Sequence, residues 1–162
     1  MHMMIKSLIL VGIIAIIAIF IQRTYFNDNP IAGENMQSGI EFLENNKNAE
    51  GVQVTDSGLQ YLVLNEGSGD THPGPTDKVK VHYHGTFIDG KVFDSSVDRG
   101  QPIDFGLNQV ISGWTEGLQL MVVGEKTRLF IPSDLAYGDR GAGPIPPGST
   151  LIFDVELLGI TE

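Results

Sequence analysis

The sequence DKVKVHYHGTF, residues 77–87, alternates between apolar and polar side chains. Val79, Val81 and Tyr83 therefore lie on one face of an extended strand. An Asp-Gly pair follows at residues 89–90, and such a pair is typical of a two-residue type I′ turn. The segment predicts a strand with one apolar face that continues into a β-hairpin.

After the hairpin, the apolar residues change to helical spacing. Trp114, Leu118 and Met121 recur at intervals of four and three residues, which places them on one side of a helix. Ser112 is the expected N-cap, because its hydroxyl can accept a hydrogen bond from an early backbone N–H. The pattern predicts one short helix that ends near Gly124.

The other apolar runs have the pattern of strands. Residues 59–63 alternate, and residues 126–132 and 149–160 are strand-like runs closer to the C-terminus. Together with residues 77–87 and the hairpin, they give five or six strands and a single short helix. One helix on one face of an antiparallel sheet is an α+β arrangement. We expect one domain of this class over residues 51–162.

The N-terminal segment is apolar over nearly the length of a membrane span. A continuous apolar core runs from Leu8 to Ile21, with Lys6 before it and Arg23 after it. Such a segment is typical of a secretory signal and is close to the lower limit for a transmembrane helix. No small-x-small cleavage motif follows, so we predict an uncleaved signal anchor over residues 1–22, with the globular part outside the cytoplasm. The open alternative is a cleaved signal, which leaves a soluble periplasmic or secreted protein.

Residues 23–50 form a polar spacer between this segment and the domain. Within the spacer, Met36, Ile40 and Leu43 fall on one face of a short amphipathic helix. We expect a spacer helix that lies on the domain or on the bilayer surface. A dimerising helix is the open alternative.

The composition excludes several classes of chemistry. The chain has no cysteine, which removes disulfides, thiol nucleophiles, thiolate metal sites and iron–sulfur clusters. Its net charge is −10 and it has no basic stripe, which disfavours nucleic-acid binding. The P-loop, G-x-S-x-G and H-E-x-x-H motifs are missing. His82 and His84 share a strand face, but two ligands are too few for a zinc site, so we predict no metal and no cofactor.

Aromatic and aliphatic residues gather near turns and around the predicted helix. Each of them alone fits a core position, but several lie in short segments rich in Gly and Pro, above all AYGDRGAGPIPPGSTL at residues 136–151. A concave apolar pocket with a few fixed polar groups is the usual form of a small-ligand site. The residues expected in such a pocket are Tyr83, Phe93, Ile103, Phe105, Val110, Ile111, Trp114, Tyr137, Ile145 and Phe153.

Three longer segments carry a resemblance to one family. The sequence is similar to the FKBP-type peptidyl-prolyl cis–trans isomerases in KVKVHYHGTFIDGKVFDSS at residues 78–96, VISGWTEGLQLMVVGEK at residues 110–126 and IPSDLAYGDRGAGPIPPGSTLIFDVELL at residues 131–158. The resemblance covers about residues 55–160. The preceding segment is similar to that of the bacterial Mip-like and FkpA-like members. The resemblance implies a twisted antiparallel sheet wrapped around one helix.

The resemblance also implies an activity and a location. It implies a rotamase that accelerates X-Pro isomerisation during the folding of extracytoplasmic proteins, by binding the twisted amide in an apolar pocket. The implied substrates are proline-containing polypeptides, and macrolide FKBP ligands are further implied ligands. The long dimerising region of the Mip-like and FkpA-like members is nearly gone here, so we expect a monomer. We expect it on the bacterial inner membrane, with a single-pass anchor and its domain in the periplasm. The alternative function is a binding or scaffold domain with little turnover.

Individual residues also receive roles from the resemblance. Asp94 is expected at the pocket wall, where it faces the carbonyl of the twisting bond or orients Tyr83, and capping of the next turn is the alternative. Ile103 stands where many members have an aromatic residue, and the loop DRGAGPIPP at residues 139–147 is a little shorter than in the best-known members and lacks a histidine. The implied catalytic residues are Tyr83, Phe93, Asp94 and Tyr137. The implied substrate-binding residues are Ile103, Phe105, Val110, Ile111, Trp114, Ile145 and Phe153.

Overall fold

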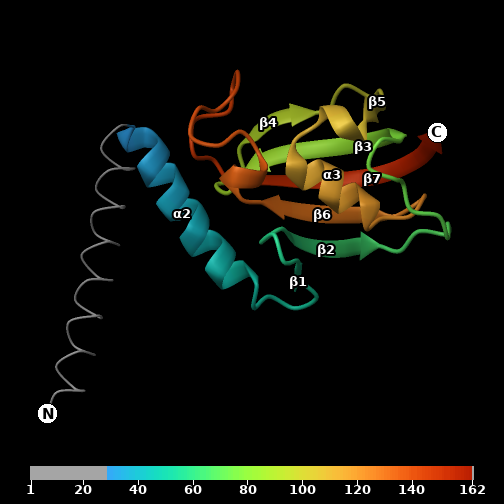
Figure 1. The fold of residues 1–162 in the computed structure, drawn as a ribbon, viewed down its shortest axis with the longest axis horizontal. Helices are drawn as coiled ribbons and strands as arrows, with labels where there is room; N and C mark the ends of the chain where they lie inside the picture. The colour runs from blue at the N-terminus through green and yellow to red at the C-terminus, as the bar shows by residue number, and fades with distance from the viewer. Residues whose placement is uncertain (1–28, 162) are drawn as a thin grey trace, which may run out of the picture.

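The computed structural model describes residues 29–161, and these residues have the predicted α+β fold. Seven strands within this range form one antiparallel sheet in the order β1-β2-β6-β7-β3-β4, and β5 also pairs with β3. The helix α3 lies across one face of the sheet (Figure 1). The strands are β1 (Gln53–Val54), β2 (Gln60–Asn65), β3 (Lys78–Phe87), β4 (Val92–Ser95), β5 (Ile103–Gly106), β6 (Lys126–Ile131) and β7 (Leu151–Thr161). The helices are α2 (Pro30–Asn46) and α3 (Ser112–Gln119), and two single 3₁₀ turns are η1 (Leu107–Gln109) and η2 (Ser133–Leu135).

Strand β3 organises the sheet. It pairs along all ten of its residues with β7, while its other edge pairs first with β5 and then with β4. Its alternation is as predicted, because Val79, Val81 and Tyr83 are all buried and point to the face that α3 covers. The strand therefore carries one pocket residue, Tyr83, directly under the helix.

Two glycines bring α3 close to the sheet. A Cβ on Gly113 would lie 2.4 Å from Cγ2 of Ile131, and a Cβ on Gly117 would lie 2.7 Å from Cδ1 of Leu129. A larger residue at either position would force the side chain of Ile131 or Leu129, or the helix itself, to shift. Since the helix is held at this distance, the side chain of Trp114 is fixed against the sheet with only 4% of its surface exposed.

Three predicted details are wrong: the type of the turn at Asp89, the N-cap of α3, and the end of α3, which lies at Gln119 rather than near Gly124. A type I′ turn needs a positive φ at both central residues, but among residues 29–161 only glycines have one, so Gly90 has it and Asp89 does not. The Asp89 carboxylate instead accepts the backbone N–H of Lys91 at 2.9 Å, and the β3–β4 hairpin itself is confirmed. Ser112 is the first helical residue rather than the N-cap, which is Ile111 and makes no side-chain capping bond.

The helix in the spacer is longer than predicted and buries a different face. It spans 17 residues from Pro30, and its N-cap is Asn29, whose side chain accepts the N–H of Ala32 at 3.2 Å. Met36 and Ile40, two members of the predicted apolar stripe, are 38% and 53% exposed. The helix runs beside the loop between β6 and β7 (Figure 1), and this close contact selects small residues. The residues that α2 buries are Ala32, Gly33 and Gly39.

The membrane prediction concerns a part of the chain that is not described. In residues 29–161 there is no helix with the length and apolar character needed to cross a bilayer. The signal anchor predicted for residues 1–22 lies outside this range.

Candidate functional site

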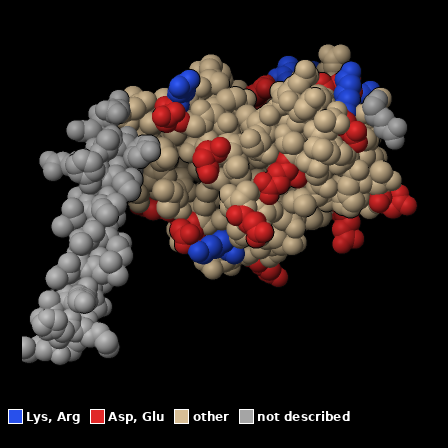
Figure 2. Space-filling model, in the orientation of Figure 1, with Lys and Arg blue, Asp and Glu red and all other residues tan. Residues whose placement is uncertain are grey.

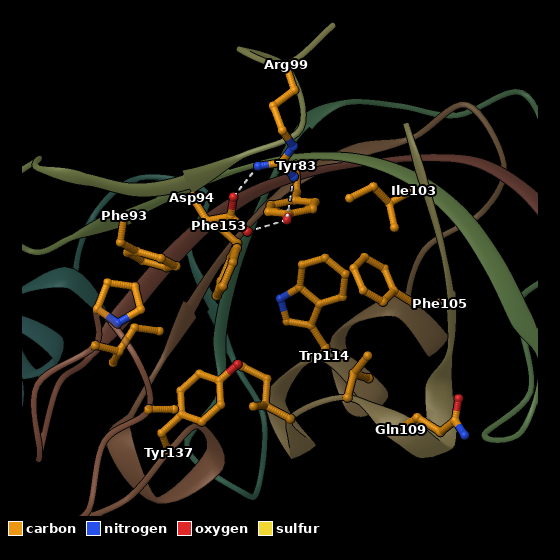
Figure 3. Close-up of a pocket in the computed structure, with 15 residues that line it drawn as sticks. Tyr83, Phe93, Asp94, Arg99, Ile103, Phe105, Gln109, Trp114, Tyr137 and Phe153 are labelled. Carbon is orange, nitrogen blue, oxygen red and sulfur yellow. Dashed lines mark hydrogen bonds and ion pairs between the residues drawn. The ribbon is translucent and has the colours of Figure 1, made fainter. Parts of the chain in front are cut away.

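A pocket of about 990 Å³ opens between α3, strands β3 to β5 and the loop of residues 136–150, which we call the flap (Figure 3). All eleven residues that the sequence predicts for a site lie together here. The pocket is lined by Tyr83, Phe93, Asp94, Arg99, Ile103, Phe105, Gln109, Val110, Ile111, Trp114, Tyr137, Ala142, Pro144, Ile145 and Phe153.

Asp94 reaches Tyr83 because of the way in which β4 ends. Gly85 of β3 pairs with Asp94 in the sheet. Just beyond this pair, the buried hydroxyl of Ser96 accepts the backbone N–H of Tyr83 at 2.8 Å. The backbone N–H of Ser96 donates to the Tyr83 carbonyl at 3.0 Å. These bonds hold the end of β4 against β3, so the Asp94 carboxylate lies beside the Tyr83 hydroxyl.

Three polar side chains form a closed network on this wall. The Tyr83 hydroxyl donates to one oxygen of Asp94, and the Arg99 guanidinium donates to the other oxygen and, at 3.0 Å, to the Tyr83 hydroxyl oxygen. Burial raises the pKa of Asp94, but the hydrogen bonds from Tyr83 and Arg99 outweigh it and bring the pKa below its ordinary value. Burial, followed by the bond to Asp94, raises the pKa of Tyr83. At neutral pH the wall therefore holds a carboxylate, a neutral phenol and a guanidinium whose charges balance.

Trp114 forms the floor of the pocket. The rings of Tyr83, Phe105 and Phe153 meet it edge-on, with centroid distances of 5.4, 5.4 and 5.2 Å. Edge-to-face packing of this kind stabilises aromatic clusters beyond the burial of their surface. The indole N–H is buried and finds no hydrogen-bond partner in the described part of the chain. The floor is thus a packed aromatic cluster that contains this unpaired N–H.

The flap closes on itself through its backbone. Ala142 and Ile145 exchange two hydrogen bonds of 3.0 and 2.9 Å, and Gly148 donates its N–H to the Gly138 carbonyl at 2.8 Å. Ile145 is buried against the pocket. Tyr137 is 41% exposed, and its hydroxyl points toward the middle of the pocket (Figure 3). The flap therefore presents one hydroxyl and the apolar residues Ala142, Pro144 and Ile145 to a ligand.

The remaining wall residues come from the strands and from the turn before α3. Ile111 has an extended backbone at the start of the helix, and its N–H makes no hydrogen bond within residues 29–161. This leaves a backbone donor at the rim of the pocket. Phe93 comes from β4, Ile103 and Phe105 from β5, Val110 and Ile111 from the turn, and Phe153 from β7.

Sequence reasoning missed four of the lining residues. Arg99 is the most consequential of them, because it completes the network on the wall. Its position offers a weak signal, since it is the one basic residue between Lys91 and Lys126. The other three that were missed are Gln109, Ala142 and Pro144.

Other polar groups near the sheet are engaged locally. Nδ1 of His82 lies 3.0 Å from the Ser96 hydroxyl, and Nδ1 of His84 lies 2.9 Å from the Ser95 hydroxyl. No group of three or more His, Cys, Asp or Glu that could hold a metal ion occurs among the described residues. Figure 2 shows acidic side chains spread over the face in view, with fewer basic ones, several of which lie near the upper right edge.

Two family models match the sequence. The model described as FKBP-type peptidyl-prolyl cis-trans isomerase matches residues 69–158. The model described as the domain amino terminal to FKBP-type peptidyl-prolyl isomerase matches residues 15–63.

Curated relatives and solved structures agree with these matches. The FKBP-type peptidyl-prolyl cis-trans isomerase FkpA of Aeromonas hydrophila is 60% identical over 131 residues, covering 81% of this chain and 48% of the relative. The FKBP-type 22 kDa peptidyl-prolyl cis-trans isomerase of Escherichia coli is 58% identical over 123 residues, covering 75% and 59%. The crystal structure of FkpA from Escherichia coli superposes with a TM-score of 0.78 at 42% identity, covering 96% of this chain and 71% of that one. The chain spans about half the length of these curated relatives.

Proposed function

Because the chain belongs to the FKBP-type peptidyl-prolyl cis-trans isomerase family, we propose that it accelerates the cis–trans isomerisation of X-Pro bonds in polypeptides. The observation that carries this proposal is the pocket, in which aromatic rings form the floor and walls around a few fixed polar groups. Its chemistry suits a reaction that breaks no covalent bond.

The reaction needs an apolar site more than it needs a nucleophile. Twisting an amide costs its conjugation, which sets a barrier of roughly 18–20 kcal/mol. A site lowers this barrier only by binding the twisted amide better than the planar one. The twisted amide has a smaller carbonyl dipole and loses less when it leaves water, so a dry aromatic pocket favours it.

We assign the floor, the flap and the rim of the pocket to substrate binding. Trp114 supports the proline ring, since it is the buried surface at the base of the pocket. The backbone N–H of Ile111 and the hydroxyl of Tyr137 donate to substrate carbonyls. Ile145 packs over the residue before proline. The walls around the ring are Phe93, Ile103, Phe105, Val110 and Phe153.

Of the three roles that the sequence offers for Asp94, we assign the orientation of Tyr83. Both of its oxygens already accept hydrogen bonds, one from Tyr83 and one from Arg99. A carboxylate in this state does not need to meet the substrate carbonyl. It fixes the direction of the Tyr83 ring, which stands edge-on to the Trp114 floor.

The substrates that we propose are proline-containing polypeptides that fold outside the cytoplasm. One relative, 49% identical over 135 residues, is named outer membrane protein MIP. Sequencing the N-terminus of the mature protein separates the two proposed forms. An intact Met1 supports the single-pass anchor, whereas a new N-terminus beyond the apolar segment supports a cleaved signal. The predicted monomer is tested by sedimentation of the purified chain.

The isomerase activity is tested on the full chain with an X-Pro peptide and with a protein whose refolding is limited by proline isomerisation. We expect acceleration of both reactions and inhibition by a macrolide FKBP ligand. Binding of the peptide without any acceleration would instead support the scaffold function. Acceleration that the macrolide does not inhibit would contradict the assignment of this pocket.

A further inference from the structure

The flap has a second face, which α2 covers. Its inner face carries Tyr137 and Ile145 into the pocket. Its outer side lies beside α2, and Figure 1 shows the helix running past the loop that precedes β7. The proposed role of the pocket leaves this contact unexplained.

Asn35 makes the shortest polar contact between the helix and the flap. Its side-chain amide donates to the carbonyl of Pro147 at 2.8 Å, across 112 positions of sequence. Asn29 makes a longer contact of 3.5 Å to the carbonyl of Asp139. Pro147 is two residues from Ile145, so the bond from Asn35 acts on the segment that carries Ile145 over the pocket.

Two glycines allow α2 and the C-terminal end of the flap to lie in close contact. Gly148 has a φ of 75°, and a Cβ there would lie 2.3 Å from the carbonyl oxygen of Ala32. On the helix, a Cβ on Gly39 would lie 2.1 Å from the hydroxyl of Thr150, a buried residue. At Gly148 the flap backbone meets the backbone of Ala32, and at Gly39 the helix backbone meets the buried side chain of Thr150, so a displacement of α2 acts on the flap.

We propose that Asn35 is a positioning residue that, through Pro147, holds the flap over the pocket, so that the placement of α2 sets how well the site binds its substrate. This inference rests on the isomerase function proposed for the same pocket. A substrate meets the flap in the ground state and in the transition state alike. A loosened flap therefore weakens the binding of the substrate and of the transition state equally, which raises KM and leaves kcat unchanged.

The test compares three variants of the full chain. Asn35→Ala removes the amide, and Asn35→Asp keeps the shape of the side chain but cannot donate from it. Asn45→Ala is the matched control, because it makes the same truncation at an exposed position of the same helix. The measurements are the hydrogen exchange of the Ile145 and Gly148 amides, both bonded within the flap, and KM and kcat on an X-Pro peptide.

Loss of one part-buried hydrogen bond is expected to raise the local opening of the flap about fivefold. Both Asn35 variants should show this faster exchange and a KM increase of up to about fivefold at constant kcat, with Asn45→Ala like wild type. Unchanged flap exchange overturns the proposal, as does a fall in kcat at constant KM. Faster exchange with an unchanged KM overturns the link to substrate binding. If wild type has no isomerase activity, the proposed function fails, while the exchange rates still decide whether Asn35 holds the flap.

Discussion

Replacing Gly85 by alanine tests whether the positions of the pocket rings matter. Gly85 lies in β3 beneath two of them, and a Cβ there would lie 2.7 Å from Cζ of Phe93 and 2.9 Å from Cε1 of Phe153. Ordinary contacts begin at 3.4 Å, so the two rings must retreat by about 0.5–0.7 Å. The φ of Gly85 is not positive, so alanine is compatible with the backbone and the effect comes from the rings.

The expected magnitudes follow from this displacement. Overpacking costs about 1–3 kcal/mol, and alanine recovers about 0.5–1 kcal/mol over glycine within a strand. The free energy of unfolding should therefore fall by up to about 2.5 kcal/mol, while the protein stays folded. A wall displaced by a large fraction of an ångström should lower kcat/KM on an X-Pro peptide about tenfold.

Gly159→Ala is the matched control for this change. Gly159 also lies in a strand, its φ is not positive, and a Cβ there would meet no atom within 4 Å. The same substitution should leave kcat/KM at its wild-type value and the melting temperature unchanged or slightly raised. The reasoning is refuted if Gly85→Ala keeps full activity, or if Gly159→Ala loses as much as Gly85→Ala does.

Two further predictions concern the polar groups of the pocket. Tyr137→Phe should lower kcat/KM about three- to tenfold through the loss of one donor, and leave the melting temperature unchanged because the side chain is 41% exposed; unaltered kinetics would contradict its role. The depressed pKa of Asp94 means that its contribution to stability is present above the unfolded pKa of about 4 and is lost as the pH falls through the lower native value. Asp94→Asn should therefore lower stability at neutral pH and remove this part of the acid dependence in urea unfolding; an unchanged acid limb in the variant would show that Asp94 is not its source.

The class of the fold was predictable because its main elements are periodic. The alternation around Tyr83 and the helical spacing around Trp114 each report which face is buried, and both faces are confirmed. The strand count was low because β1 has two residues and β5 has four, which is too short for a period to show. The prediction for the Asp89 turn failed for a different reason, since the Asp89 side chain accepts the backbone N–H of Lys91, two residues on, and stabilises a different turn.

Site residues that belong to family motifs could be predicted from the sequence. A residue whose place in the site depends on a single tertiary contact could not. Arg99 sits in a turn without any periodic pattern, and only the tertiary structure brings it onto Asp94. The face of α2 was misjudged because Met36 and Ile40 dominate its hydropathy. The contact with the flap requires small residues, because α2 and the flap lie close together. Sequence hydropathy contains no information about the distance between them.

Trp114 is also the single tryptophan of the chain. Indole fluorescence depends on the polarity around the ring, and all tryptophan fluorescence of this chain comes from the floor of the pocket. A ligand that binds against Trp114 changes the wavelength or the intensity of this fluorescence, so no added fluorophore is needed. Occupancy can thus be titrated optically and compared with turnover in the same cuvette. Any compound that inhibits the proposed isomerisation without altering the emission acts somewhere other than on the floor.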